Sequence, residues 1–240
     1  MKPNKILRTA QWNANGLQRH KDEIILFLKQ NYIDILLISE THFTSKNYFT
    51  IPGYKLCYTN HPDGTAHGGT AILIKDTITY YEQLKYEEEA IRATSITVKG
   101  LLHEITIAAV YCLPRHNLKK EQSATFFQTL GSKFIAGGDY NSKHTLWDSW
   151  LTTTKGRELS KEFQEKNYYF LSTGSPTYWP TDVNKIPDLL DFFITNGIST
   201  TYVDIQASYD LTSDQTPIIA TISTSISITV RQLPPRLHNS

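Results

Sequence analysis

Short apolar runs of strand length alternate along the chain with a few stretches of helical periodicity. In the first half, strand-like runs fall at residues 6–12, 35–38, 69–75, 90–99 and 103–112. In the second half they fall at 133–137, 189–195, 201–206 and 217–228. Apolar positions three or four residues apart predict helices at 19–30, 118–130 and 155–166. Lys99-Gly100 fits a tight turn between two of the strands.

The order of these elements predicts the fold class. The run at 35–38 is apolar throughout, as expected for a strand buried on both faces. Hairpin-like neighbours are mixed with helices that connect strands. This order favours an α/β fold in which two mixed β-sheets pack face to face with helices outside. A chain of 240 residues suits one such domain.

Periodicity is lost at the end of the chain. Residues 226–240 include Arg231, Pro234, Pro235 and Arg236, and no signal closes the segment as a structural element. We therefore expect a folded domain at 1–225 and a linker toward a further region at 226–240. No internal repeat divides the domain.

Composition narrows the class of protein. The 24 Lys and Arg nearly balance the 23 Asp and Glu, whereas a protein that holds nucleic acid by charge alone is usually more basic. An acidic metal site within a modestly basic groove would balance in this way. Two cysteines without motif spacing argue against structural zinc and fit a reducing compartment. No apolar run approaches about 20 residues, so we expect neither a signal peptide nor a membrane span.

Carboxylates and amides gather at the ends of the predicted strands. They are Asn13, Asn15, Glu40, Asp139, Asn141, Asp191 and Asp214, and Tyr111 closes the strand at 103–112. Taken singly, a carboxylate after a strand is more often a turn or helix cap. Together these groups could converge on one rim of a sheet sandwich, where clustered oxygen atoms suit Mg²⁺ or Mn²⁺.

Five short motifs occur in a familiar order. They are Trp-Asn-Ala-Asn-Gly-Leu at 12–17, Ser-Glu-Thr at 39–41, Gly-Gly-Asp-Tyr-Asn at 137–141, Leu-Asp-Phe-Phe-Ile at 190–194 and Ser-Asp-Gln at 213–215. In this order they resemble the exonuclease–endonuclease–phosphatase superfamily from residue 7 to about residue 221. The resemblance implies a DNase I-like four-layer α/β sandwich and a metal-dependent phosphodiesterase.

A closer resemblance is to the endonuclease domain of jockey-like non-LTR retrotransposons. It rests on residues 12–17, on Asp-Tyr-Asn-Ser-Lys-His at 139–144 and on Ala-Val-Tyr-Cys-Leu-Pro at 109–114. It implies an enzyme that nicks double-stranded chromosomal DNA so that the freed 3′-hydroxyl primes reverse transcription. A covalently linked reverse transcriptase would follow the linker. The protein would act in the nucleus after synthesis in the cytoplasm.

The superfamily resemblance also implies roles around the metal. Glu40 would be the principal ligand of Mg²⁺ or Mn²⁺, and Asp214 would complete the acidic cluster. Asn15 stands near a position often held by Asp, and its weaker amide oxygen would bind the ion directly or support it. Asn13 would bridge to the carboxylates of the metal site.

The remaining implied roles concern the attacking water and the phosphate. Asp139 would orient or deprotonate the water, and Asn141 would hold Asp139 or a phosphate oxygen. Tyr111 would donate to a phosphate oxygen or steady the leaving group.

Gln215 departs from the superfamily pattern, in which this residue is a histidine paired with Asp191. Its amide can donate to a phosphate oxygen and to Asp191, but it cannot shuttle a proton or become cationic near neutral pH. General acid–base assistance is worth roughly 10²–10⁴ in rate, so a slow or inactive enzyme is predicted. The chain is then a decayed or disabled copy, which we favour, or a lineage in which another group such as His144 substitutes.

Candidate DNA contacts lie in loops. The basic groups are Arg115, His116, Lys143, His144, Lys155 and Arg157, and the aromatic pair is Tyr178 and Trp179. The pair Arg115-His116 follows Tyr111, and the pair Lys143-His144 follows Asn141. Their position after candidate catalytic residues favours phosphate contacts over solvated loop charges. The aromatic pair could stack on DNA or belong to the core.

Two other functions stay open at this point. One is a phosphatase of the same fold acting on a small phosphorylated substrate, which the basic loops and the linker disfavour. The other is a DNA-binding domain without catalysis, which Gln215 makes credible. Fold-level kinship cannot decide between them.

Overall fold

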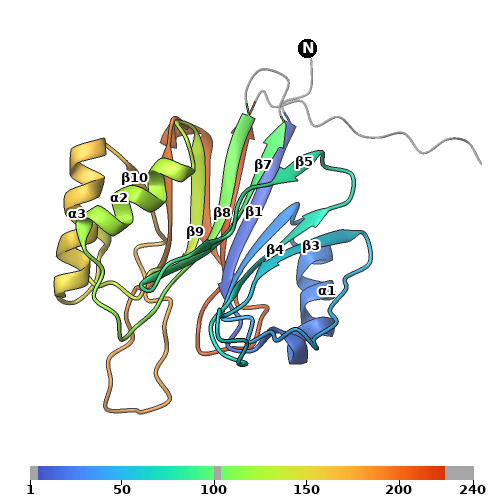
Figure 1. The fold of residues 1–240 in the computed structure, drawn as a ribbon, viewed down its shortest axis with the longest axis horizontal. Coiled ribbons are helices and arrows are strands. Elements are labelled where there is room, and N and C mark those ends of the chain that lie inside the picture. The colour runs from blue at the N-terminus through green and yellow to red at the C-terminus, as the bar shows by residue number, and fades with distance from the viewer. Residues whose placement is uncertain (1–4, 100–103, 225–240) are drawn as a thin grey trace, which may run out of the picture.

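Two β-sheets form the centre of the computed structural model, which describes residues 5–99 and 104–224 (Figure 1). The first contains β1 (Lys5–Asn13), β2 (Ile35–Ser39), β3 (Tyr54–Thr59), β4 (Thr70–Lys75), β12 (Val203–Ala207) and β13 (Ile218–Thr224), in the order β12-β13-β1-β2-β4-β3. The second contains β5 (Tyr80–Glu82), β7 (Ile91–Lys99), β8 (Glu104–Cys112), β9 (Phe134–Asp139), β10 (Tyr169–Leu171) and β11 (Asp191–Asn196), in the order β10-β11-β9-β8-β7-β5. The short β6 (Tyr86–Glu87) pairs with β7.

Each sheet is mixed, because one pair of neighbouring strands in each is parallel and the others are antiparallel. The parallel pairs are β1–β2 in the first sheet and β8–β9 in the second. Helix α1 (Lys21–Gln30), entered through a 3-10 turn at Leu17–His20, lies beside the first sheet. Helices α2 (Lys120–Thr129) and α3 (Thr154–Lys166) lie beside the second (Figure 1). Short 3-10 turns occur at Thr145–Trp147 and Thr200–Tyr202. The predicted four-layer sandwich is confirmed.

Three hydrophobic clusters fill the spaces between the layers. Leu37, Ile107 and Phe193 belong to the cluster that joins the two sheets. Phe27 of α1 packs with Leu36 of β2 in a second cluster, and aromatic side chains of α2 and α3 form part of the third. Leu36 and Leu37 thus belong to clusters on opposite faces of β2, which explains its unbroken apolar run. Burial of each such side chain contributes about 1.5–3 kcal/mol.

Most predicted elements are present with small shifts in their ends. Strands β3, β5, β6 and β10 were not predicted, because three of them have only two or three residues and β3 is an edge strand interrupted by Lys55. The run at 217–228 is a strand as far as Thr224. Its last residues, the Lys99-Gly100 turn and the linker at 226–240 lie outside the described residues.

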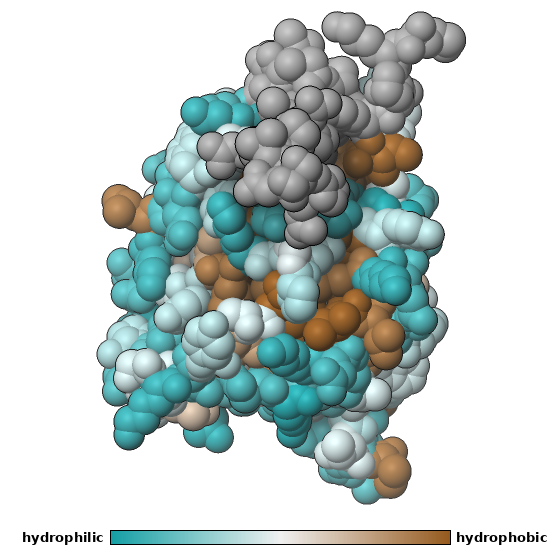
Figure 2. Space-filling model, turned by 90° about the vertical axis from the view of Figure 1, so that its right-hand side faces the viewer, coloured by the Kyte–Doolittle hydropathy of each residue, from teal (hydrophilic) through white to brown (hydrophobic). Residues whose placement is uncertain are grey.

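The surface is described by its hydropathy on one face of the molecule. The face shown in Figure 2 is mostly hydrophilic, with hydrophobic residues gathered near its centre. Within residues 5–99 and 104–224, no helix is long and apolar enough to cross a membrane. Both cysteines are buried as free thiols.

Candidate active site

The strand-end groups meet at one rim of the sandwich because of the two parallel pairs. Parallel strands end at the same edge of a sheet, and Asn13 of β1 lies opposite Ser39 of β2. In the second sheet, Tyr111 of β8 lies opposite Asp139 of β9. The Ser39 hydroxyl donates to the Val110 carbonyl and accepts from the Asp139 amide, so the two sheets are joined at this rim. In Figure 1 it is the end away from the labelled N-terminus.

Sharp backbone turns direct the polar side chains at this rim. Asn15, Glu40 and Asn141 have φ values of 42°, 52° and 45°, in the left-handed region that non-glycine residues rarely adopt. Gly138 precedes Asp139 where a Cβ would lie 1.9 Å from the Val110 carbonyl oxygen. A glycine is therefore required there, which accounts for the Gly-Gly-Asp motif.

Asn13 joins the two main carboxylates of the site. Its side-chain nitrogen donates to Glu40 Oε1 at 2.8 Å and to Asp139 Oδ2 at 2.9 Å. Its oxygen accepts from the Asn15 backbone amide at 3.0 Å, and its side chain is buried. One amide therefore holds both acids in place, as the bridging role of Asn13 requires.

Asp139 is a buried carboxylate with three donors. Asn13 and Gln215 both donate to Oδ2, the latter from Nε2 at 3.0 Å, and the Asn141 backbone amide donates to Oδ1 at 2.8 Å. Burial and the nearby charge of Glu40 nevertheless raise the pKa of Asp139 to about 7, against the opposing effect of these hydrogen bonds. A carboxylate with this pKa is suited to accept a proton near neutral pH.

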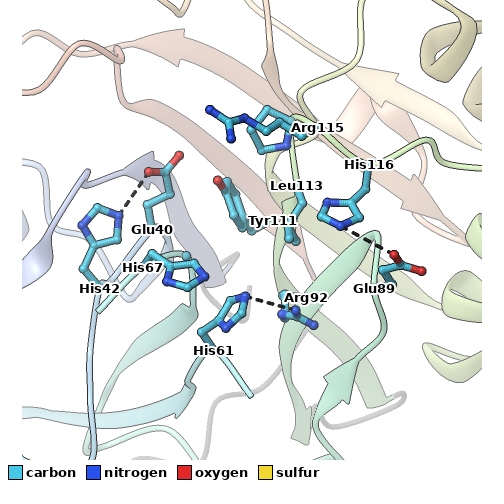
Figure 3. Close-up of a pocket in the computed structure, with 12 residues that line it drawn as sticks. Glu40, His42, His61, His67, Glu89, Arg92, Tyr111, Leu113, Arg115 and His116 are labelled. Atoms are coloured by element: carbon cyan, nitrogen blue, oxygen red, sulfur yellow. Dashed lines mark hydrogen bonds and ion pairs between the residues drawn. The ribbon is translucent and has the colours of Figure 1, made fainter. Parts of the chain in front are cut away.

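Glu40 stays acidic although it is largely buried. Burial acts to raise its pKa, but hydrogen bonds from His42 and Asn13 outweigh this and lower it. His42 Nε2 lies 3.3 Å from Glu40 Oε2. The Tyr111 hydroxyl points toward the same region (Figure 3). Burial and the charges of Glu40 and Asp139 raise the pKa of Tyr111, so Tyr111 remains a hydrogen-bond donor.

Asp191 and Gln215 are both buried. The sequence allows a hydrogen bond from the Gln215 amide to Asp191, but the structure does not contain this bond. The Gln215 amide donates to Asp139 instead. Asp191 Oδ2 accepts from the Thr177 hydroxyl at 2.8 Å, while Asp191 Oδ1 and Gln215 Oε1 have no partner among the described residues. Thr177 thus satisfies one oxygen of Asp191, and the amide nitrogen of Gln215 is used by Asp139 at the centre of the site.

Asn15 and Asp214 offer oxygen atoms for a cation. Asn15 is exposed and Asp214 is partly exposed. With Glu40 they supply the carboxylate and amide oxygens that Mg²⁺ or Mn²⁺ prefers, so these residues fit a divalent ion. Within residues 5–99 and 104–224, a separate group of His61, Asp63 and His67 has ligand atoms within 4.8 Å of one another.

Two of the lysines expected to contact DNA are engaged within the protein. Lys155 is buried, and its ammonium group donates to the Leu113 carbonyl at 2.6 Å. Lys143 Nζ lies 2.9 Å from Asp188 Oδ2, and Asp188 is buried. Lys155 therefore has a structural role, since a buried ammonium needs acceptors within the protein. Lys143 is partly exposed and forms an ion pair with a buried acid.

The other basic candidates differ in exposure. Arg115 and Arg157 are exposed, Arg157 Nη2 donates to the Thr154 hydroxyl at 3.2 Å, and His116 Nε2 lies 3.6 Å from Glu89. His144 Nδ1 accepts from the Leu146 amide and caps a 3-10 turn. His144 therefore has a structural task, and none of its hydrogen bonds reaches Asp139 or Asp191.

The aromatic pair lies at the base of the long loop before β11. Tyr178 forms backbone bridges with Asp188 and Gln215, so this loop is tied to the catalytic rim. Trp179 is 48% exposed, and its ring nitrogen donates to the Thr216 hydroxyl. Trp179 is thus available to stack on a ligand, whereas Tyr178 is only partly exposed.

Sequence reasoning missed His42, His61, His67 and Arg92. With Glu40 and Tyr111 they line a cavity of about 480 Å³ (Figure 3). A signal existed for Arg92, the one arginine in an otherwise neutral strand at 91–98. The histidines come from the turns after β2 and β3, where nothing in the sequence pattern distinguishes a site from a solvated loop.

The fold and this cluster of strand-end acids and amides define a class of protein. Residues 10–215 match the Endonuclease/Exonuclease/phosphatase family, and the chain belongs to it.

Curated relatives confirm the resemblance to jockey-like elements. The chain is 33% identical over 216 residues to the RNA-directed DNA polymerase from mobile element jockey of Drosophila melanogaster, covering 90% of this chain and 24% of that protein. It is 31% identical over 226 residues to the probable RNA-directed DNA polymerase from transposon BS of the same species, covering 93% and 25%. The chain therefore spans about a quarter of the length of these relatives.

Solved structures show the same fold. The endonuclease domain of TRAS1, a telomere-specific non-LTR retrotransposon, superposes with a TM-score of 0.75 at 20% identity, covering 91% of this chain and 99% of that one. The AP endonuclease LMAP from Leishmania major gives a TM-score of 0.74 at 13% identity, covering 93% and 90%.

Proposed function

We propose that this chain is a metal-dependent DNA endonuclease domain that nicks double-stranded DNA and leaves a 3′-hydroxyl. The observation that carries the proposal is the Asn13 amide, which donates to both Glu40 and Asp139. It holds the candidate metal ligand Glu40 beside the candidate base Asp139 at the rim of the sandwich. The family and the polymerase relatives support the choice of a phosphodiester in DNA as the substrate.

Hydrolysis needs a positioned water, a proton acceptor and stabilisation of the charge that develops on the phosphate. Glu40, Asn15 and Asp214 would hold Mg²⁺ or Mn²⁺, which supplies charge stabilisation when bound. Asp139 takes the proton of the attacking water, since its pKa lies near neutrality. Asn141 holds the strand-end turn of Asp139, and Tyr111 donates a hydrogen bond to a phosphate or leaving oxygen.

Gln215 limits this chemistry. It adds a hydrogen bond to Asp139, which favours the charged form of that acid, but it supplies no transferable proton. We therefore propose a nuclease that is slow for its family. The free oxygen of Asp191 supports descent from a pair in which the partner was a histidine.

The polymerase relatives support a biological setting for this activity. We propose that residues 1–225 form the endonuclease domain and that 226–240 lead to a reverse transcriptase in a longer protein. The freed 3′-hydroxyl would prime reverse transcription on chromosomal DNA, and the protein would act in the nucleus after synthesis in the cytoplasm.

A comparison of substrates tests the proposal. Purified protein is incubated with supercoiled plasmid or with inositol phosphates, with Mg²⁺, with Mn²⁺ or with EDTA. We expect metal-dependent nicking of plasmid, nicks that a DNA polymerase extends without further treatment, and no phosphate release from inositol phosphates. Phosphate release without nicking would identify a phosphatase. DNA binding without nicking at high protein concentration, even in Mn²⁺, would identify a non-catalytic binding domain.

A further inference from the structure

The turn between β3 and β4 brings two histidines and an aspartate together. Its sequence, His-Pro-Asp-Gly-Thr-Ala-His at 61–67, places ligand atoms of His61, Asp63 and His67 within 4.8 Å of one another. Nδ1 of His61 lies 2.7 Å from Asp63 Oδ1, and Nε2 of His67 lies 3.7 Å from Asp63 Oδ2. The centroids of the two imidazole rings are 3.7 Å apart. Neighbouring ligand atoms of a tetrahedral zinc site are roughly 3.4 Å apart, so these separations suit one shared ion.

Thr65 orients both His67 and the carboxylate of Asp63. The Thr65 hydroxyl donates to Asp63 Oδ1 at 2.7 Å, so it can accept a hydrogen bond from His67 Nδ1, which it contacts. That arrangement leaves the lone pair of His67 on Nε2, the atom nearest Asp63 Oδ2. Histidines that bind metal ions usually donate their other ring N–H to a fixed acceptor, which holds the ring in place. His67 is therefore held as a metal ligand would be.

His61 has a buried ring nitrogen that no hydrogen bond satisfies. Its Nδ1 has no hydrogen-bond partner among the described residues, although Asp63 Oδ1 is only 2.7 Å away. The carboxylate oxygen therefore lies off the direction in which Nδ1 could donate or accept a hydrogen bond. An ion that bound His61 Nδ1 together with Asp63 would give this nitrogen the partner that it lacks within the protein.

The charges around the turn favour a cation. Burial lowers the pKa of Arg92, and the nearby charges of Glu87, Asp63 and Glu88 oppose this effect. Three carboxylates thus act on one guanidinium, and the sum of these charges is negative. Arg92 Nη2 lies 3.4 Å from His61 Nε2. Metal binding through Nδ1 would put the ring proton on Nε2, so it would displace only this one long hydrogen bond.

The turn is fastened beside the candidate active site. The Gly68 carbonyl accepts from the His42 amide at 2.9 Å, which ties the end of the turn to the segment that follows Glu40. Both histidines of the turn line the same cavity as Glu40 (Figure 3). An ion held by the turn would lie at the wall of this cavity without using Glu40, Asn15 or Asp214.

We propose that His61, Asp63 and His67 bind a transition-metal ion of the Zn²⁺ class, with water completing its coordination. Two imidazole nitrogens and one carboxylate favour such an ion over Mg²⁺, which prefers oxygen ligands throughout. The ligand set contains no cysteine, which is why the cysteine pattern of the sequence gave no sign of it. The bound ion would close residues 61–67 into a rigid loop at the cavity wall. This inference goes beyond the proposed function and does not depend on nuclease activity.

Metal titration tests the site. The full chain carrying Glu40→Gln is the background, because this change disables the proposed Mg²⁺ site. It is titrated in excess Mg²⁺ with Co²⁺, which absorbs visible light far more strongly when four-coordinate than when octahedral, and Zn²⁺ is then added. We expect a single equivalent of four-coordinate Co²⁺, which Zn²⁺ displaces. In the same background, Thr65→Val should weaken Zn²⁺ binding about 10–100-fold, the usual effect of removing the partner that orients a ligand. His67→Ala removes a ligand itself and should weaken binding by more than about 100-fold.

His116→Ala is the matched control, because His116 lines the same cavity but pairs with Glu89 outside the turn. It should bind Zn²⁺ as the background protein does. The His67 side chain is 54% exposed, so its replacement should leave the fold intact. Zn²⁺ should also slow hydrogen exchange at the amides of residues 63–67 in the background protein and not in the His67→Ala variant.

Three results would overturn the inference. They are the absence of a four-coordinate Co²⁺ spectrum in the background protein, a Zn²⁺ affinity that His67→Ala leaves unchanged, and an equal loss of affinity in His116→Ala. None of these measurements uses DNA or nicking. Failure of the proposed function would therefore leave this inference standing, and the reverse is also true.

Discussion

The Gln215 side-chain amide donates to the Asp139 carboxylate over 3.0 Å, and the oxygen of the same amide has no partner among the described residues. Asp191 Oδ1 is equally without a partner and equally buried. The site therefore retains Asp191 Oδ1 as an acceptor suited to an imidazole N–H, while Gln215 donates its hydrogen bond to Asp139.

Replacement of Gln215 by histidine should accelerate nicking. The new imidazole can donate to the free oxygen of Asp191 and supply the proton transfer that an amide lacks. We expect Gln215→His to raise the nicking rate roughly 10²–10⁴-fold. Initial rates on supercoiled plasmid in Mg²⁺ measure the effect, and Gln215→Ala is the control for simple loss of the bond to Asp139. Equal rates for the wild type and Gln215→His would show that position 215 does not limit the enzyme.

Loss of the Asn13 side chain should reduce the nicking rate more than the affinity for DNA. Asn13→Ala removes one donor from each of two carboxylates, and a hydrogen bond to a charged group is worth about 1.5–3 kcal/mol. We expect a loss of about 10²-fold in nicking rate and little change in DNA affinity in EDTA. An affinity that falls as much as the rate would assign Asn13 to binding instead.

The raised pKa of Asp139 should make the metal-free protein less stable as the pH rises. Below about pH 4 the carboxyl is protonated in both the folded and unfolded states. Between there and about pH 7 the unfolded chain loses the proton and the folded chain keeps it, so folding stability falls across this interval. Each pKa unit is worth about 1.4 kcal/mol, so titration of Asp139 should cost the wild type a few kcal/mol across this interval, a loss that Asp139→Asn avoids because it does not titrate.

Unfolding in urea with EDTA at pH 5 and pH 8 measures this difference. The wild type should lose more stability than Asp139→Asn between the two pH values. Parallel behaviour of the two proteins would contradict the assignment of the raised pKa to Asp139.

Substitutions of Lys155 and Arg157 should differ in their effect on stability, because Lys155 is buried and Arg157 is exposed. Lys155→Met leaves the Leu113 carbonyl without its buried donor, and we expect a loss of about 1–3 kcal/mol in unfolding free energy. Arg157→Gln changes an exposed side chain and should alter stability by less than about 0.5 kcal/mol. Chemical denaturation measures both. Equal stability of Lys155→Met and the wild type would return Lys155 to the candidate DNA contacts.

The sequence was informative where a local pattern determines the structure. The unbroken apolar run of β2 predicts a strand buried on both faces, and the polar residues after β1, β2 and β9 predict a shared rim. Arg92 and the histidines of the cavity depend on strand pairing and turn geometry, which no local pattern specifies. Lys155 looks like a solvated lysine in sequence, because the carbonyls that hold it belong to a loop more than 40 residues earlier.

Plasmid nicking by the wild-type chain against Asp139→Ala tests the central claim most directly. Both proteins are incubated with supercoiled plasmid in Mg²⁺, and the relaxed product is followed over time. The proposed function predicts slow relaxation by the wild type, which EDTA abolishes, and no relaxation by Asp139→Ala. Equal relaxation by the two proteins, or none by the wild type at high concentration in either Mg²⁺ or Mn²⁺, would contradict it.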